Sequence, residues 1–441
     1  MGAEERLLKL EAASASFKEE VETYGLSFEE GESQPRCQRK EAAATAHARC
    51  ENNDASLSRG WMSSACVACR KGEETATFFV SLKCTRSCYF CFNPNQERFA
   101  YYCQHERDIA GELQKAYSEG KKYSHVAVTG GEPCLHPKEL CDFLETAKKL
   151  YPHVHVRLYT SGDRLTDRLL QSLAALGLDE IRFSIKQEEG RESIEQQLKL
   201  IGDAVGVIPA VMVEMPVIPG TIDEMKTLLH RLDALGVRGI NLLEFCFPLF
   251  NGDEFRNRGF KIRARPYEIL YDYWYAGGLP VAGSETEALE LLRYADERGL
   301  RMGVHYCSLD NKLTGQVYQQ NKVLLSDSAG RLLPWLSMDE VDYFAKCTKV
   351  YGEDVERTTR ALEKLSDEGV LAVPFDLDAP QACYLNECGD ELLFPLPWAE
   401  CVHAADESIA LYASFNMIEA CAGAPCPKEV ALLPLPFPRN L

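Results

Sequence analysis

The stretch Cys84-Thr85-Arg86-Ser87-Cys88-Tyr89-Phe90-Cys91 decides the fold, and it follows an apolar run, residues 77–82, that predicts a buried strand. Its three cysteines have the spacing C-x3-C-x2-C. Thiolates in such a loop can bind three corners of a cubane [4Fe–4S] cluster, whereas a tetrahedral zinc or a fully protein-ligated cluster needs a fourth ligand. One iron would then stay open. The alternatives are a disulfide pair and an incomplete zinc site, and an acidic chain without secretory features argues against oxidised pairs.

A second motif, Val128-Thr129-Gly130-Gly131-Glu132-Pro133, lies about one strand–helix unit further along the chain. Two glycines at the end of a strand let the backbone approach a ligand without a clash from a Cβ atom. The carboxylate that follows them can receive an ammonium group. The motif therefore predicts a ligand-binding turn.

Together, the two motifs and the aromatic Phe90 before the last cysteine resemble the signature of the radical S-adenosylmethionine (SAM) enzymes. In that family the open iron binds the amino and carboxylate groups of SAM. An electron from the cluster then cleaves SAM to methionine and a 5′-deoxyadenosyl radical, which abstracts hydrogen from the substrate. The resemblance implies that the metal ligands are Cys84, Cys88 and Cys91 and that Phe90 packs near the adenine. It also implies that the residues holding the amino group of SAM are Gly130, Gly131, Glu132 and Pro133.

Short apolar runs alternate with amphipathic stretches from Thr77 onward, which predicts an α/β fold with a parallel sheet and right-handed crossovers. The predicted strands are residues 77–82, 125–129, 154–159, 180–185, 210–217 and 240–247. The predicted helices between them are residues 106–119, 137–150, 165–176, 192–205 and 222–235. This pattern matches the partial (β/α)6 barrel of the radical SAM family, an open relative of the eight-stranded barrel.

Composition divides the chain into three predicted parts. Residues 1–70 are charged and alanine-rich and read as an N-terminal helical extension, and residues 71–310 hold the predicted barrel. Residues 311–441 read as a small, mixed C-terminal accessory domain with a proline-rich end.

Chemistry in such barrels gathers at the carboxyl ends of the strands, which directs attention to residues there. Ser161 and Ser184, after the third and fourth strands, are candidates for contacts with SAM, and Lys186 could pair with its carboxylate. The resemblance places the adenine against the backbone near Val217 and Ile218. Elsewhere, a buried Glu244 on the sixth strand would have to be either partnered or functional, because an unpaired buried carboxylate is costly.

Cysteines outside the central loop have several readings. Cys66 and Cys69 form a C-x2-C pair that cannot close a metal site alone, so a structural or auxiliary role is favoured. Cys307, in a His-Tyr-Cys-Ser sequence, is expected to pack beside His305. Six further cysteines lie in the C-terminal part, where they could bind a second iron–sulfur cluster, although their spacing does not match the seven-cysteine pattern of known auxiliary clusters.

The net charge of −19 disfavours a nucleic-acid partner, which needs a basic surface. No run of about 18 apolar residues predicts a membrane span, and the acidic start of the chain does not resemble a signal peptide. We therefore expect no membrane association and a cytoplasmic protein, in which 18 cysteines stay reduced, pack or bind metal.

Three functions follow from the resemblance. The first is a radical SAM enzyme that modifies or activates a protein or peptide and takes electrons from flavodoxin or ferredoxin. It rests on a likeness to a little-characterised group related to pyruvate formate-lyase activating enzymes, in which a similar His-Tyr-Cys-Ser sequence follows the barrel. The second is a cobalamin-dependent radical methyltransferase, loosely similar to the methanogenesis-marker methylase, although no cobalamin-binding motif is visible. The third is a non-catalytic iron–sulfur redox protein.

Overall fold

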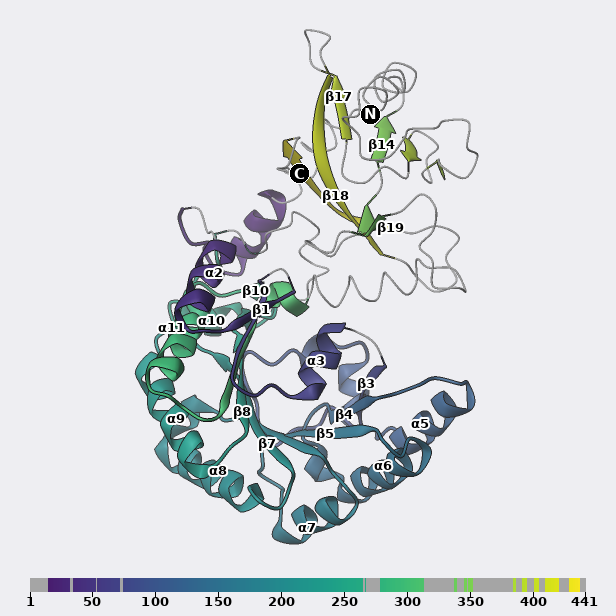
Figure 1. Ribbon diagram of the computed structural model, residues 1–441, viewed down its shortest axis with the longest axis vertical. Coiled ribbons are helices and arrows are strands. Elements are labelled where there is room, and N and C mark those ends of the chain that lie inside the picture. The colour runs from purple at the N-terminus through teal and green to yellow at the C-terminus, as the bar shows by residue number, and fades with distance from the viewer. Residues whose placement is uncertain are drawn as a thin grey trace. The chain divides into compact units, whose positions relative to one another are not determined.

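The structure is a computed structural model, shown as ribbons in Figure 1. It describes residues 15–31, 35–52, 54–71, 74–264, 266 and 278–312, together with short strands between residues 337 and 436. The chain divides into two compact units, and the larger comprises Tyr24–Pro266 and Gly277–Lys312. This unit includes residues 24–70, most of the segment that the sequence assigned to an N-terminal extension.

A nine-stranded sheet forms the centre of the larger unit, in the order β1-β2-β11-β8-β7-β6-β5-β4-β3. Strands β3 to β8 run parallel to one another and β11 runs parallel to β8, so the predicted α/β fold with a mostly parallel sheet is confirmed. The parallel strands are β3 (Thr75–Phe79), β4 (His125–Thr129), β5 (His155–Thr160), β6 (Glu180–Phe183), β7 (Ala210–Val217), β8 (Gly239–Glu244) and β11 (Gly303–Cys307).

The sheet extends beyond the six predicted strands at one edge. Strand β11 pairs with β8, and the hairpin of β1 (Arg49–Glu51) and β2 (Ser56–Arg59) then pairs antiparallel to β11. The predicted strand at residues 240–247 is divided into β8 and β9 (Cys246–Phe247), and β9 pairs with β10 (Leu279–Pro280). The hairpin covers a sheet edge that would otherwise expose unpaired backbone groups.

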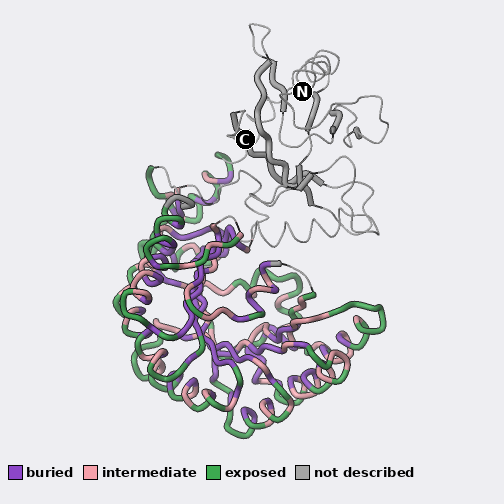
Figure 2. The backbone as a smooth tube through the Cα atoms, in the orientation of Figure 1, coloured by how far each residue is buried: buried purple, intermediate pink, exposed green. Residues whose placement is uncertain are grey.

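Helices cover the outer face of the curved sheet (Figure 1). They are α5 (Ile109–Ser118), α6 (Pro137–Leu150), α7 (Asp167–Ala175), α8 (Gly190–Ala204), α9 (Ile222–Leu235) and α11 (Ser284–Glu297). Each presents an apolar stripe to the sheet. In α6 the buried residues Leu140, Phe143, Leu144 and Ala147 follow the i, i+3, i+4, i+7 spacing of one helix face. The resulting core lies between sheet and helices, as Figure 2 shows in purple.

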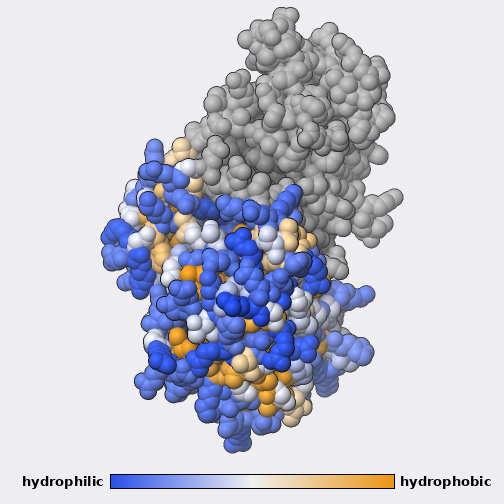
Figure 3. All heavy atoms as spheres, turned by 60° about the vertical axis from the view of Figure 1, so that its left-hand side comes forward, coloured by the Kyte–Doolittle hydropathy of each residue, from blue (hydrophilic) through white to orange (hydrophobic). Residues whose placement is uncertain are grey.

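The outward side of these helices is largely hydrophilic on the face shown in Figure 3. Among the described residues, no helix combines the length and the apolar composition needed to cross a membrane. The larger unit also contains α2 (Pro35–Thr45) and the short α10 (Gly252–Asn257).

Helix α3 (Ser64–Lys71) lies on the inner side of the sheet (Figure 1). Polar contacts hold it there: the hydroxyl of Ser63, just before the helix, donates to Glu180 at 2.5 Å, and Arg182 donates to the sulfur of Cys66 at 3.3 Å. Asn241 on β8 donates to the same sulfur at 3.3 Å. The inner face of the sheet is therefore lined by a buried polar network.

The smaller unit comprises Met1–Thr23, Tyr267–Ala276 and Leu313–Leu441. Its described strands form a two-stranded sheet, β12-β13, and two three-stranded sheets, β14-β16-β15 and β17-β18-β19, all antiparallel. The bounds are β12 (Ser337–Met338), β13 (Ala345–Lys346), β14 (Thr348–Tyr351), β15 (Tyr384–Leu385), β16 (Glu391–Phe394), β17 (Glu400–His403), β18 (Ile409–Glu419) and β19 (Lys428–Pro436). The cysteines outside the described residues are Cys347, Cys383, Cys388, Cys421 and Cys426.

Candidate functional site

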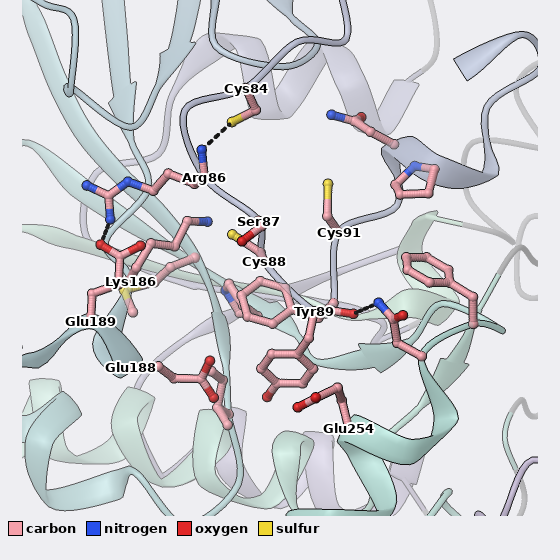
Figure 4. Close-up of a pocket in the computed structure, with 18 of the residues that line it drawn as sticks. Cys84, Arg86, Ser87, Cys88, Tyr89, Cys91, Lys186, Glu188, Glu189 and Glu254 are labelled. Atoms are coloured by element: carbon pink, nitrogen blue, oxygen red, sulfur yellow. Dashed lines mark hydrogen bonds and ion pairs between the residues drawn. The ribbon is translucent and has the colours of Figure 1, made fainter. Parts of the chain in front are cut away.

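A cavity of about 910 Å³ opens at the carboxyl ends of the parallel strands (Figure 4). Its walls come from the cysteine loop, the segment after β6, the end of β7 and the segment around α10. The lining residues used below are Cys84, Cys88, Tyr89, Phe90, Cys91, Cys103, Lys186, Glu188, Glu189, Ile218, Asn251, Glu254 and Arg258.

The thiols of Cys84, Cys88 and Cys91 face a common space in this cavity (Figure 4). Sulfurs on one tetrahedral zinc lie about 3.8 Å apart, since each Zn–S bond is about 2.3 Å long. In the described part of the chain, these sulfurs belong to no set of three ligand atoms that all lie within 4.8 Å of one another. At least one pair of these sulfurs is therefore too far apart for a single tetrahedral ion, whereas a cubane offers each sulfur its own iron.

Opposing effects act on the pKa values of the thiols in the cysteine loop. Partial loss of solvent around the thiols raises the pKa of Cys84 and of Cys91, and the neighbouring sulfurs raise it further. Backbone N–H groups of Arg86 and Asn93 and the ammonium of Lys186 act in the opposite direction. Because thiolates are the form that binds metal, a bound cation would stabilise the deprotonated state that burial opposes.

The two glycines of the second motif hold the base of the cysteine loop. A Cβ atom on Gly130, which has a φ of +110°, would lie 2.6 Å from the carbonyl oxygen of Ser81, and one on Gly131 would overlap the carbonyl oxygen of Lys83. The amide of Gly131 donates to Ser81 at 3.0 Å, and that of Glu132 donates to Lys83 at 2.8 Å. The close approach that the sequence predicted is thus made by the protein's own backbone.

Glu132 has a different environment from the predicted one. Its carboxylate is 1% exposed and accepts hydrogen bonds from the hydroxyl of Thr160 at 2.6 Å and from the amide of Cys134 at 3.0 Å. The amide and the hydroxyl of Ser161 donate to it at 2.7 and 2.6 Å. Four donors fill the acceptor sites of a carboxylate, so Glu132 joins β4 to β5 and its oxygens are not available to an ammonium group in this arrangement.

Of the predicted SAM contacts, the structure brings Phe90 and Ile218 to the cavity wall. The others are not among its lining residues: Gly130, Gly131, Glu132, Pro133, Ser161, Ser184 and Val217.

Ser184 and Val217 have partners within the protein, as Gly131, Glu132 and Ser161 do. The hydroxyl of Ser184 donates to the carbonyl of Glu214 at 3.3 Å, and the carbonyl of Val217 accepts from the hydroxyl of Ser284 at 2.8 Å. Lys186 does border the cavity, with its ammonium 5.4 Å from the ring centroid of Phe90.

The sequence did not indicate that Asn251, Glu254 and Arg258 form a wall of this cavity beside the cysteine loop. The Arg258 guanidinium lies 4.1 Å from the ring centroid of Tyr89, forms an ion pair with Glu254 and reaches Glu188 at 3.4 Å. Asn251 donates to the carbonyl of Tyr89 at 3.0 Å. The Glu254–Arg258 spacing of i, i+4 signals a pair on one helical turn, but its position beside the cysteine loop depends on tertiary structure.

Asn251 thus clamps one side of the cysteine loop, and Arg86 clamps the other side. The guanidinium of Arg86 donates to Asp163 at 2.8 Å and pairs with Glu189, and the hydroxyl of Thr85 donates to Asp163 at 2.7 Å. Burial alone would raise the pKa of Asp163, yet these hydrogen bonds from Arg86 and Thr85 lower it below its usual value. The cysteine loop is thereby fixed to the ends of β5 and β6.

Glu244 is the partnered carboxylate that the sequence allowed for. It accepts from Arg263 at 2.7 Å and from the amide of Leu309 at 2.8 Å. Burial, as the largest cause, raises its pKa to about 7.

The residues of the His-Tyr-Cys-Ser sequence are likewise engaged by the protein. His305 lies between Ser56 at 2.9 Å and Asn241 at 3.0 Å, and the sulfur of Cys307 accepts from Asn311 at 3.2 Å. Neither residue lines the cavity.

Comparison with known proteins places these features in context. Residues 79–232 match the Radical SAM superfamily. A protein of Methanocaldococcus jannaschii, named as a candidate glycyl-radical enzyme activating enzyme, is 26% identical over 234 residues, which cover 52% of this chain and 59% of that protein. A protein of Thermococcus kodakarensis, named as a candidate GTP 3′,8-cyclase, is 29% identical over 165 residues, 35% of this chain and 52% of that protein.

Solved structures also resemble the chain. One is the crystal structure of Streptococcus suis SuiB bound to S-adenosylmethionine, with 14% identity, a TM-score of 0.38 and coverage of 54% of this chain and 50% of that chain. The chain spans between half and three-fifths of the length of these relatives.

Proposed function

Because residues 79–232 match the Radical SAM superfamily, we propose that the chain is a radical SAM enzyme with a [4Fe–4S] cluster held by Cys84, Cys88 and Cys91. When bound, the cluster and SAM supply reductive cleavage to methionine and a 5′-deoxyadenosyl radical, which takes a hydrogen atom from the substrate. The observation that carries the proposal is the convergence of three thiols on the cavity at the carboxyl ends of the strands.

The chain's own residues have positioning roles in this proposal. Lys186 offers the carboxylate of SAM a cation close to the cysteine loop, and the ring of Phe90 offers its adenine an apolar surface. Phe90 is held in place by edge-on contacts with Tyr89 and Phe245, at centroid distances of 5.0 and 5.5 Å. The loop clamps formed by Arg86 and Asn251 keep the three thiols in register.

We propose that the substrate is a protein or peptide. The support is the likeness to the candidate glycyl-radical enzyme activating enzyme, whose name describes action on another enzyme. The electron donor in this proposal is a small protein such as flavodoxin or ferredoxin. Cys84 is exposed, so one corner of the cluster would lie near the surface, where such a donor could reach it.

The test is anaerobic reconstitution with iron and sulfide, followed by incubation with SAM and dithionite. The proposal predicts 5′-deoxyadenosine, quantified by mass spectrometry, in the wild-type protein and none in Cys88→Ala. Cys141→Ala is the matched control, because Cys141 lies on α6 and does not line the cavity. A full cluster without 5′-deoxyadenosine would contradict the proposed chemistry.

The substrate class has a separate test. Protein fractions from cells of the source organism are added to the assay. If a fraction raises 5′-deoxyadenosine formation and loses this effect after protease treatment, the substrate is a protein or peptide. An equal effect from the protease-resistant small-molecule fraction would contradict it.

A further inference from the structure

A second group of ligand-type side chains lies outside the cavity, beside the turn that follows β4. It consists of Glu106 from the loop before α5, His136 just before α6, and Glu139 in the first turn of α6. One ligand atom from each residue lies within 4.8 Å of the other two. Two segments of the chain, the loop before α5 and the start of α6, therefore bring a nitrogen and two oxygens close together.

The imidazole of His136 is held in one orientation. The residue is 9% exposed, its Nε2 atom lies 2.7 Å from the hydroxyl oxygen of Ser81, and its Nδ1 atom lies 2.9 Å from Oε1 of Glu106. When Nε2 carries the proton and donates to Ser81, the lone pair of Nδ1 points toward the carboxylates. Metal-binding histidines commonly have such a partner on the second ring nitrogen, which fixes both tautomer and orientation.

The nearby cations are directed to other carboxylates. Arg107, next to Glu106, donates to Glu112 at 2.8 Å, and Lys138, next to Glu139, pairs with Asp142 at 2.5 Å. Within the described residues, the carboxylate of Glu139 forms no ion pair or hydrogen bond. An oxygen of Glu106 and one of Glu139 thus lie close to each other and to a ring nitrogen of His136.

We propose that Glu106, His136 and Glu139 bind one divalent transition-metal ion. Imidazole nitrogen with carboxylate oxygen is a ligand set of zinc, manganese and ferrous iron, and the exposed side of Glu106 leaves room for water ligands. The ion would stiffen the junction of the two motifs, since Ser81 contacts His136 through its hydroxyl and Gly131 through its carbonyl.

Binding of Mn²⁺ tests the proposal. Mn²⁺ prefers oxygen and nitrogen to thiolate, so the many cysteines do not compete for it. Titration of the cluster-loaded, oxidised protein, followed by loss of the EPR signal of free Mn²⁺, should show one site per chain.

Glu139→Gln should weaken this site by about tenfold or more, because it removes a ligand. Glu145→Gln is the matched control: it removes the same charge from an exposed position of α6 and should leave the affinity unchanged. Equal affinities in the two variants, with both proteins retaining the wild-type cluster absorbance, or no saturable binding by the wild type, would overturn the proposal.

Discussion

The amide of Glu132 donates to the carbonyl oxygen of Lys83 at 2.8 Å, so the second motif lies directly against the base of the cysteine loop. No side chain fits between them, since a Cβ atom on Gly131 would overlap the same oxygen. The carbonyl oxygen of Lys83 belongs to the backbone next to Cys84, so it cannot move away from a Cβ atom without moving the loop that carries the thiols. The second motif therefore positions the cysteines, whatever further contact it makes with SAM.

Gly131→Ala should displace the cysteine loop and reduce cluster retention several-fold, because the strain exceeds the 1–3 kcal/mol or so typical of overpacking. Iron per chain after anaerobic reconstitution and desalting measures the loss. Gly202→Ala on α8 is the control, since a Cβ there meets only Leu235 at 3.4 Å. Equal iron contents in the two variants would show that the loop does not depend on this contact.

Glu132→Gln should lower the free energy of unfolding by about 1–3 kcal/mol, because the new amide group faces buried donors that a carboxylate oxygen satisfied. Urea denaturation of the cluster-free protein measures this change without any contribution from SAM. An unchanged unfolding free energy, combined with weaker SAM binding, would mean that the carboxylate serves the ligand rather than the fold.

His305 predicts a pH-dependent contribution to stability. Burial, followed by the charges of Arg70 and Arg182, lowers its pKa from 6.5 to about 3. The unfolded chain therefore binds a proton below pH 6.5 that the folded imidazole does not accept. The stability that neutral His305 contributes is complete above pH 6.5 and is lost as the pH falls toward 3.

His305→Gln removes this titration. At pH 7 the variant should be less stable than the wild type, because the hydrogen bonds to Ser56 and Asn241 are altered. The difference in unfolding free energy should narrow as the pH falls from 6.5 to 3. A constant difference across this range, measured by urea denaturation at each pH, would contradict the assignment of a buried neutral imidazole.

Local sequence patterns were sufficient for the strand–helix repeats. Helices α6 and α9 and strand β7 have the predicted bounds, because an amphipathic stripe or an apolar run gives each a clear beginning and end. The hairpin of β1 and β2 was missed. Its strands are three and four residues long, and β2 pairs with β11, more than 240 residues away in sequence, as in the pairing of Arg59 with Val304.

For the candidate site too, the sequence predicted the local features but not those that depend on tertiary structure. The spacing of Cys84, Cys88 and Cys91 is a local property, and the structure brings their sulfurs to one cavity as the motif predicts. The predicted role of Glu132 depended on which donors surround it, and three of its four donors come from Thr160 and Ser161 at the end of β5. Likewise, nothing in the sequence alone indicates that Arg258 lies over Tyr89.

Cys103 also borders the cavity, and it is the described thiol outside the motif that could occupy the fourth corner of a cluster. The proposal assigns that corner to SAM. Cys103→Ala should therefore retain about four irons per chain, whereas Cys88→Ala should lose most of its iron, because two thiolates hold a cubane poorly. Iron and sulfide assays after desalting give the comparison.

The most direct measurement is the EPR spectrum of the dithionite-reduced protein, recorded with and without SAM, in the wild type and in Cys103→Ala. An open iron that binds SAM predicts a shift of the cluster signal on addition of SAM in both proteins, with equal iron content. An unchanged spectrum in a fully loaded wild-type protein, or loss of iron in Cys103→Ala, would show that the protein itself closes the fourth position.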